Sequence, residues 1–226
     1  MSLAKEPESE KDESSILIVD FQPIVRLGLI YLINNSNGLK VCGEAENVHE
    51  AMELIKVLKP DIVIVDISIK GVNGIKLIEN IRQQYSNLPI LVFSMLDESF
   101  YAERVLNAGA NGYLMKHEAL KNIIKAIHCV LFERFFLSDK VSAKVMYKSL
   151  FNKSKNHYSS IELLSNRELE VFRLIGRGYG TRRIAEELYL SIRTVETYRK
   201  HIKDKLNLKN GEELLRQAIQ WVKNER

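Results

Sequence analysis

Five short apolar runs, separated by segments with helical periodicity, most strongly constrain how this chain can fold. The runs cover residues 16–19, 39–43, 62–65, 90–93 and 112–114. Three of them are four-residue stretches without polar alternation, which is typical of strands buried on both faces of a parallel sheet. The amphipathic segments lie near residues 23–34, 48–58, 74–85, 99–108 and 118–132. Five strand–helix repeats predict an α/β domain built on a doubly wound, five-stranded parallel sheet.

Polar residues follow four of these runs directly: Asp20, Asp66, Ser94 and Lys116. In a doubly wound sheet, functional groups gather beyond the carboxyl ends of the strands, so we expect these four side chains to converge. Two carboxylates could hold Mg²⁺, one Asp could attack a phosphoryl donor, and the Lys and the hydroxyl could hold phosphoryl oxygens. The alternative is that both acids cap loops and the Lys lies on the surface.

The chain after residue 136 has only helical signals. Residues 138–151 predict one helix, and residues 152–157 have the polar composition of a linker. Beyond them, Ser165 with Glu168 three residues later is the pattern of a capping box. Four short helices predict a small all-α domain.

Two further helix starts and a final amphipathic helix complete this prediction. We expect Thr181 to cap a short helix and Ser191 to cap a longer one that runs to about Leu206. The last helix follows Gly211 and has Trp221 beside its apolar face. We expect Trp221 to pack within the domain, with the same helix face as a candidate dimer contact.

Charge is divided unevenly along the chain. Residues 1–150 hold 17 Lys and Arg against 19 Asp and Glu, whereas residues 151–226 hold 16 against 10. The net charge of +4 therefore combines −2 with +6, and the basic C-terminal part is the candidate to bind a polyanion. Residues 1–14 lack apolar anchors and are expected to form a disordered leader. Cys42 and Cys129 are too few and too far apart for a disulfide framework or a zinc cluster.

The first half resembles the receiver domains of two-component systems over about residues 15–135. The matching segments are 16–20 (ILIVD), 63–67 (VIVDI), 90–94 (ILVFS) and 108–116 (AGANGYLMK). The resemblance implies that Asp66 is the phosphoacceptor, Lys116 the ion-pairing lysine, Ser94 the switch hydroxyl and Tyr113 the rotating aromatic. It also implies that modification of Asp66 draws in Ser94, turns Tyr113 inward, favours dimerisation and releases the C-terminal domain.

Phe21 departs from the receiver pattern, because it stands where the family has a second acid that contacts the metal directly. A phenyl ring cannot ligate Mg²⁺, so a metal would depend on Asp66, the backbone carbonyl of Ser68 and waters near Asp20. Two hypotheses follow for this domain. Either phosphorylation persists with a weakened dependence on Mg²⁺, or the domain is a degenerate pseudo-receiver used for dimerisation or ligand sensing.

The last third resembles the LuxR-type helix-turn-helix of NarL/FixJ response regulators over residues 161–226. The matching segments are 164–171 (LSNRELEV), 184–188 (IAEEL), 190–198 (LSIRTVETY) and 205–206 (KL). Independently, Val195, Tyr198, Ile202 and Leu206 recur at helical spacing and predict a buried stripe on one helix. The opposite face would then carry the polar side chains of a recognition helix.

Two groups of residues are candidates to contact double-stranded DNA. By the family resemblance, Glu196, Thr197 and Lys200 look toward base edges in the major groove. The candidates to contact phosphates are Arg193, Arg199 and Lys203 on this helix, with Arg182 and Arg183 on the preceding one. Thr194, at the start of the same helix, is a further DNA-binding candidate. The alternative is an amphipathic helix whose basic face is only solvated.

These features identify the chain as similar to a bacterial response regulator: a DNA-binding transcription regulator controlled by phosphorylation. The resemblance implies a sensor histidine kinase and a DNA operator as partners, and a homodimer as the DNA-binding form. An enzyme on a similar sheet is disfavoured, since we see neither a Gly-rich phosphate loop nor a nucleophile–base pair, although a receiver can catalyse its own phosphorylation and dephosphorylation. No apolar run approaches the roughly 18 residues of a membrane span, so we expect no membrane contact and a cytoplasmic location.

Overall fold

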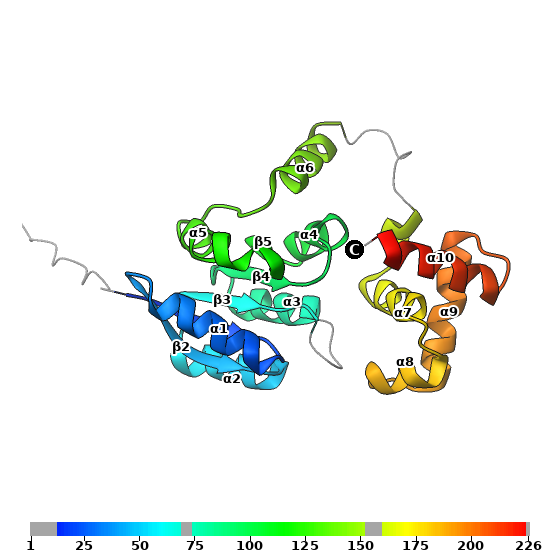
Figure 1. Cartoon of the computed structure of the whole chain (residues 1–226), viewed down its shortest axis with the longest axis horizontal. Helices are drawn as coiled ribbons and strands as arrows, with labels where there is room; N and C mark the ends of the chain where they lie inside the picture. Colours follow the sequence, from blue (N-terminus) through cyan, green and yellow to red (C-terminus); the bar gives the residue numbers. More distant parts are fainter. Residues whose placement is uncertain (1–12, 69–73, 152–159, 225–226) are drawn as a thin grey trace, which may run out of the picture.

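The computed structural model describes residues 13–68, 74–151 and 160–224. An α/β domain and a smaller helical domain lie side by side, and the helix α6 (Asp139–Phe151) extends away beyond α4 and α5 (Figure 1). The polar linker expected over residues 152–157 and residues 1–12 of the expected leader lie outside the described residues.

A parallel sheet of five strands forms the centre of the α/β domain, as the apolar runs predict. The strands are β1 (Ser14–Val19), β2 (Leu39–Ala45), β3 (Ile62–Val65), β4 (Ile90–Ser94) and β5 (Gly112–Met115). Their spatial order is β2-β1-β3-β4-β5, and every neighbouring pair is parallel. The chain therefore reverses its direction of winding after β2, so the carboxyl ends of β1 and β3 lie next to each other.

Helices cover both faces of the sheet. They are α1 (Pro23–Asn34), α2 (Val48–Leu58), α3 (Gly74–Gln84), α4 (Glu98–Asn107) and α5 (Ala119–Leu131). Successive side chains of a strand point to opposite faces, so Leu17 and Val19 pack toward α2, α3 and α4. Ile16 and Ile18 pack toward α1 and α5. This arrangement explains why the strand runs lack polar alternation: neither face of the sheet meets water.

The helical domain contains a short 3-10 turn, η2 (Ser160–Leu163), followed by four helices. These are α7 (Asn166–Gly176), α8 (Thr181–Glu187), α9 (Ile192–Leu206) and α10 (Gly211–Asn224). The capping box is confirmed, because the Ser165 hydroxyl accepts a hydrogen bond from the Glu168 N–H while the Glu168 carboxylate accepts one from the Ser165 N–H. Ser191 also caps its helix. The expectation for Thr181 is wrong: Gly180 holds the N-cap position, with no side-chain cap, and Thr181 is already the first helical residue.

Close packing between α7 and α10 depends on Gly176. A Cβ atom there would lie 2.3 Å from the backbone oxygen of Ala218, far inside van der Waals contact. The missing side chain lets the two helix backbones approach, which keeps α10 against α7. Cys42 and Cys129 are both free thiols in this structure. Within the described ranges, no helix is long and apolar enough to cross a membrane.

Candidate functional site

The four polar strand-end residues lie together at one edge of the sheet. Asp20, Asp66 and Lys116 follow β1, β3 and β5, and Ser94 is the last residue of β4. Strand order places these four ends in sequence across the sheet. Among the described residues of this domain, Asp20, Asp66 and Ser94 are the buried polar ones, with 0–2% of their surface exposed. The expected convergence is therefore found. The alternative of a surface lysine does not hold, although both acids also cap the loops that follow them.

Lys116 links both carboxylates. Its Nζ atom lies 2.6 Å from Oδ2 of Asp20 and 2.9 Å from Oδ2 of Asp66. It also donates to Oε1 of Gln22 at 3.2 Å. Only 7% of the lysine side chain is exposed, so the ammonium group is held by these oxygens instead of by water. One cation thus neutralises part of the charge of two adjacent buried acids.

The outer oxygens of the two carboxylates accept hydrogen bonds from the backbone. Oδ1 of Asp20 accepts from the N–H of Gln22 at 2.8 Å, and Oδ1 of Asp66 accepts from the N–H of Ser68 at 2.9 Å. Burial raises the pKa of Asp20, and the nearby Asp66 carboxylate adds to the rise, while Lys116 and the Gln22 N–H lower it. The ionised Asp20 is therefore a costly group in this fold.

Ser94 and Tyr113 form a second layer beneath the acids. The Ser94 hydroxyl lies 3.2 Å from the Ser68 hydroxyl and accepts from the N–H of Leu96 at 3.3 Å. Tyr113 is 1% exposed, and its hydroxyl donates to the carbonyl of Leu96 at 2.8 Å. Burial raises the pKa of Tyr113 well above its ordinary value. The Tyr113 ring is therefore already buried in this structure. The inward rotation that the resemblance implies would not change its position further.

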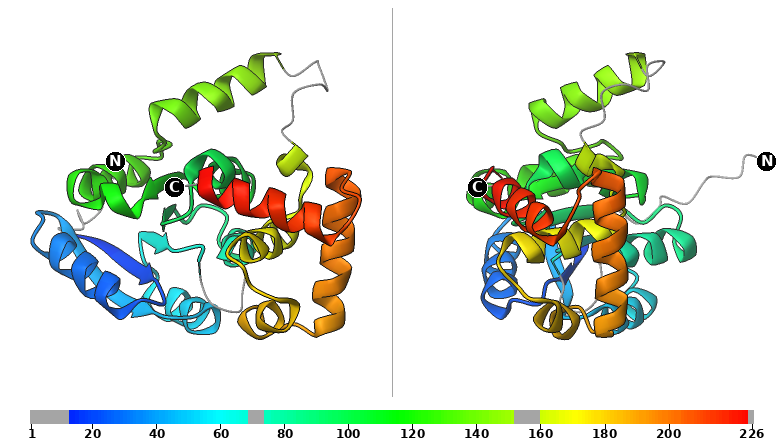
Figure 2. Two further views of the ribbon diagram at one scale, coloured as in Figure 1. Left: turned by 45° about the vertical axis from the view of Figure 1, so that its right-hand side comes forward. Right: turned by 90° about the vertical axis from the view of Figure 1, so that its right-hand side faces the viewer.

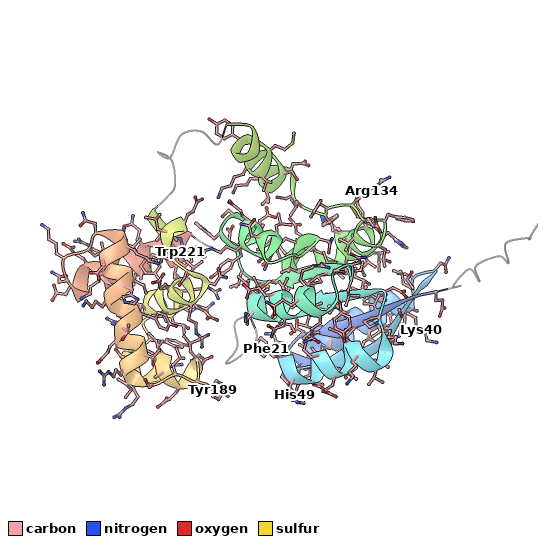
Figure 3. All side chains as sticks on the ribbon, turned by 180° about the vertical axis from the view of Figure 1, so that it is seen from behind. Phe21, Lys40, His49, Arg134, Tyr189 and Trp221 are labelled. Carbon is pink, nitrogen blue, oxygen red and sulfur yellow. The ribbon has the colours of Figure 1, made fainter. Side chains whose placement is uncertain are left out.

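A cavity of about 270 Å³ lies between the two domains, and its walls include Asp66 and Phe21. Phe21 stands where the family resemblance implies a second acid (Figure 3). Among the described residues, no group of three or more His, Cys, Asp or Glu side chains could hold a metal ion. Mg²⁺ is nevertheless often bound by only one or two carboxylates with several waters. Asp20 and Asp66 supply such a pair, and they fit Mg²⁺ as a two-carboxylate site in which Lys116 competes for the same oxygens.

The helix α9 has the two faces that its sequence predicts. Val195, Ile202 and Leu206 are buried and Tyr198 is half-buried, so the predicted apolar stripe is confirmed. This stripe packs on α7 and α8, and α9 stands at the outer side of the helical domain (Figure 2). The outward polar side chains are consequently free to approach a large partner.

The candidate base-reading residues Glu196, Thr197 and Lys200 are all exposed on α9. The Thr197 hydroxyl donates to the carbonyl of Arg193 at 3.0 Å, which commits its polar atom to the helix and leaves the methyl group for apolar contact. The remaining candidates on this helix differ in exposure: Arg193 is exposed, and Thr194, Arg199 and Lys203 are half-buried. Burial lowers the pKa of Arg199.

Arg182 and Arg183 are exposed at the start of α8. The guanidinium carbon of Arg183 lies 3.9 Å from the centre of the Tyr179 ring, a cation–π distance. The ring restricts where the guanidinium group can point. Sequence patterns did not single out Tyr179. Its place four residues before Arg183 was the one signal that could have indicated this contact.

Glu168 connects the helix α7 to the helix α9. Its carboxylate accepts a hydrogen bond from Lys205 Nζ at 2.6 Å in addition to the capping bond from Ser165. Burial alone would raise the pKa of Glu168, but the bonds from Lys205 and Ser165 outweigh it, and the pKa lies below its ordinary value. The cap of α7 thus also fixes the position of α9.

Contacts between the two domains involve the helix α4. The Phe100 ring lies 5.1 Å from the ring of Trp221 on α10, edge to face. Arg104 donates to Oδ1 of Asn166, the first residue of α7, at 2.9 Å. No sequence pattern indicated Phe100 or Arg104, and Trp221 was expected to pack only within its own domain. Trp221 does pack there, 5.6 Å from the Phe172 ring, but it also faces the α/β domain (Figure 3).

Two families of known proteins match the chain, one for each domain. A family described as "Response regulator receiver domain" matches residues 16–128. A family described as "Bacterial regulatory proteins, luxR family" matches residues 162–218. The first match contains the clustered acids and Lys116, and the second contains α7, α8 and α9.

Individual relatives extend over both domains. The chain is 32% identical over 208 residues to the oxygen regulatory protein NreC of Staphylococcus aureus, which covers 90% of this chain and 96% of NreC. RcsB from Salmonella enterica serovar Typhimurium, solved with the promoter rprA and the phosphomimetic BeF3-, is 26% identical with a TM-score of 0.64, covering 90% of this chain and 97% of that one. A structure of two RcsB dimers on two parallel DNAs is 26% identical with a TM-score of 0.55, with the same coverage of both chains.

Proposed function

Because the chain belongs to the response regulators that join a receiver domain to a LuxR-type DNA-binding domain, we propose that phosphorylation of Asp66 controls its binding to DNA. The protein is a DNA-binding transcription regulator of a two-component system, not an enzyme in its own right. We assign residues 15–135 to the receiver, 136–160 to the connection and 161–226 to the DNA-binding domain. Residues 1–14 are assigned to a leader, although its last residue, Ser14, is already the first residue of β1.

Lys116, held between two acids, is the observation that carries this proposal. One oxygen of Asp66 attacks the phosphorus of the donor, and the bond from phosphorus to the donor breaks with its electron pair going to the leaving group. The ammonium group of Lys116 then stabilises the added negative charge on the phosphoryl oxygens. The Ser94 hydroxyl is a second group that would hold one of these oxygens.

Receiver domains bind Mg²⁺ for phosphorylation, and here we propose Asp20, Asp66 and the backbone carbonyl of Ser68 as its ligands. A bound metal ion would neutralise part of the negative charge on the phosphoryl group. With Phe21 in place of a third carboxylate, more of this neutralisation falls to Lys116. We therefore propose a weakened dependence of phosphorylation on Mg²⁺.

We propose that α9 enters the major groove of an operator. Glu196, Thr197 and Lys200 read base edges there, while the phosphate contacts come from Arg182, Arg183, Arg193, Arg199 and Lys203. Thr194 lies at the start of α9 beside the cap, where its N–H donates to the Ser191 hydroxyl, and we keep it as a candidate phosphate contact. The exposure of Glu196, Thr197 and Lys200 supports this division.

The partners that follow are a sensor histidine kinase as phosphoryl donor, a double-stranded operator and a second copy of this chain. Dimers are proposed because a helix-turn-helix of this size reads a two-fold operator as a pair, and RcsB was solved as dimers on DNA. Because its proposed partner is a DNA operator, we propose that the protein works in the bacterial cytoplasm.

Incubation with acetyl phosphate and measurement of the intact mass test the phosphoacceptor. We expect the mass of one phosphoryl group to appear on the wild-type chain and to be absent from Asp66→Ala. Asp61→Ala is the matched control, because Asp61 is a carboxylate at the opposite end of β3, next to Ser15. Equal labelling of Asp66→Ala and the wild type would reject Asp66.

A second candidate is a pseudo-receiver that works without phosphorylation, and the position of Tyr113 favours it. With its ring buried and its hydroxyl bonded to Leu96, the aromatic has no inward rotation left to perform. For this candidate, DNA affinity would be the same for the wild type, Asp66→Ala and the chain treated with beryllofluoride.

A further inference from the structure

The ammonium group of Lys116 has all of its hydrogen-bond donors engaged in this structure. A lysine ammonium group carries three N–H donors, and here they point to Oδ2 of Asp20, Oδ2 of Asp66 and Oε1 of Gln22. Stabilisation of a phosphoryl group on Asp66 requires a donor directed at a phosphoryl oxygen. One of the three present bonds must therefore be given up when Asp66 is phosphorylated.

Gln22 is the weakest of the three acceptors. Its amide oxygen is neutral and lies 3.2 Å from the Nζ atom of Lys116, whereas the carboxylate oxygens of Asp20 and Asp66 lie at 2.6 Å and 2.9 Å. Hydrogen bonds to ionised acceptors are shorter and about twice as strong as those between neutral groups. Of the three bonds, the one to Gln22 consequently costs the least to break.

The start of α1 explains why this amide reaches the site. Gln22 holds the N-cap position, but its side chain makes no capping bond, and Pro23 follows as the first helical residue. The backbone carbonyl of Gln22 accepts from the N–H of Arg26 at 3.2 Å, and its own N–H donates to Oδ1 of Asp20 at 2.8 Å. The backbone of Gln22 is thus fixed beside the acids, and its side chain is left to bind Lys116.

Gln22 also lines the cavity between the two domains, together with Asp66 and Lys116. Its amide oxygen therefore lies in the same space that a group bonded to Asp66 would enter. The helical domain adds two acids and two arginines to the lining: Glu170, Glu187, Arg173 and Arg177. Their formal charges are balanced, and they stay the same in every variant described below, so differences between these variants report on Gln22.

We propose that Gln22 is a positioning residue whose amide oxygen holds, on the ammonium group of Lys116, the place of a phosphoryl oxygen. One oxygen of Asp66 attacks the phosphorus of the donor, and the leaving group departs with the electron pair of its bond to phosphorus. The N–H that pointed to Gln22 then turns to a phosphoryl oxygen, while the bond from Lys116 to Asp20 is kept. The inference rests on the proposed function, in which Asp66 is the phosphoacceptor.

The rate of phosphorylation tests this exchange, because a hydrogen bond that must be broken slows the transfer. Gln22→Met keeps the length of the side chain and removes the acceptor. Its initial rate of labelling by acetyl phosphate at a fixed Mg²⁺ concentration, measured by intact mass, should rise about threefold, the effect of one net hydrogen bond. A substitution that only loosened the site would lower the rate. Gln84→Met, at an exposed glutamine that ends α3, is the matched control and should be labelled at the wild-type rate.

Release of the amide is observed directly by NMR of the isotope-labelled full-length protein. The side-chain NH₂ signals of Gln22 are identified by their absence from Gln22→Met. During labelling with excess acetyl phosphate and Mg²⁺, we expect them to shift toward the signals of the exposed Gln84. In Asp66→Ala they should stay in place. The same spectra identify a variant that fails to fold, in which case Gln22→Asn decides, because its shorter side chain withdraws the oxygen from Lys116 and should give the same rise in rate.

The outcomes separate this inference from the proposed function. If Asp66 is labelled but the folded Gln22 variants are labelled at the wild-type rate or more slowly, Gln22 does not hold the place of a phosphoryl oxygen. Side-chain signals of Gln22 that stay unchanged while Asp66 is labelled reject the exchange as well, and the phosphoacceptor stands in both cases. If Asp66 is never labelled, the proposed function fails and the inference fails with it.

Discussion

The ammonium group of Lys116 lies closer to Asp20 than to Asp66, at 2.6 Å against 2.9 Å. Both carboxylates are almost completely buried, so a single cation stands against two anions in a place with little water. The shorter contact goes to the acid that is not the proposed phosphoacceptor. Because two carboxylates face one ammonium group, the site has excess negative charge. A substitution that removes one of these charges should change the free energy of unfolding.

Replacement of Asp20 by Asn should stabilise the receiver by about 1–2 kcal/mol at neutral pH, because it leaves one balanced buried pair, Lys116 with Asp66. Burial raises the pKa of Asp20, so the ionised form costs stability above that pKa. As the pH falls through the raised pKa, the wild type gains a proton and the difference between the two proteins should shrink. Urea unfolding at pH 7 and near pH 4 measures both effects; an Asn variant that is less stable at pH 7 would contradict the argument.

Phe21→Asp should make phosphorylation by acetyl phosphate depend more strongly on Mg²⁺. A carboxylate at this position adds a hard oxygen ligand next to Asp66. We expect about a tenfold lower Mg²⁺ concentration for half-maximal labelling, which corresponds to about 1.4 kcal/mol. Intact mass over a Mg²⁺ titration gives the midpoint. Phe21→Leu is the control, since it changes the ring but adds no ligand, and its midpoint should match that of the wild type.

The fold followed from the sequence more completely than the site did. Runs such as residues 62–65 are apolar on both faces because helices cover both faces, and this fixed the sheet and hence the meeting of Asp20 with Asp66. The contact between Arg104 and Asn166 joins residues 62 positions apart in different domains. Neither periodicity nor strand-end rules describe how two finished domains pack, so the cavity between them was outside the reach of sequence patterns.

Acid should weaken the helical domain through Glu168. Its pKa is depressed in the folded state, so its contribution is fully present above the unfolded value of roughly 4.3 and is lost as the pH falls through the lower folded pKa. Glu168→Gln should remove this part of the pH dependence and cost about 1–3 kcal/mol at pH 7, because Lys205 loses its charged partner. Thermal unfolding between pH 7 and pH 3 tests it. Glu186→Gln, on the exposed side of α8, is the matched control.

Two substitutions on α9 should have different effects on DNA binding. Lys203→Ala should weaken binding to every duplex and lower the slope of log affinity against log salt by about one unit. Thr197→Ser removes only the methyl group and keeps the hydroxyl that bonds to Arg193, so it should alter the preference among sequences. Anisotropy titrations over a salt series and selection from a random duplex pool measure the two effects. Equal effects of both changes on all sequences would show that phosphate and base contacts were assigned wrongly.

Tyr179 should contribute to DNA binding without touching DNA, by orienting Arg183. The guanidinium group stacks 3.9 Å from the ring centre, and an exposed cation–π contact contributes about 0.5–1 kcal/mol. Tyr179→Leu should therefore reduce affinity for a random duplex about two- to fivefold, whereas Tyr179→Phe, which keeps the ring, should bind like the wild type. Coupling is tested in a double-mutant cycle: in an Arg183→Ala background, Tyr179→Leu should cause no further loss. A loss of the same size in both backgrounds would mean that Tyr179 acts through packing of the helical domain instead of through Arg183.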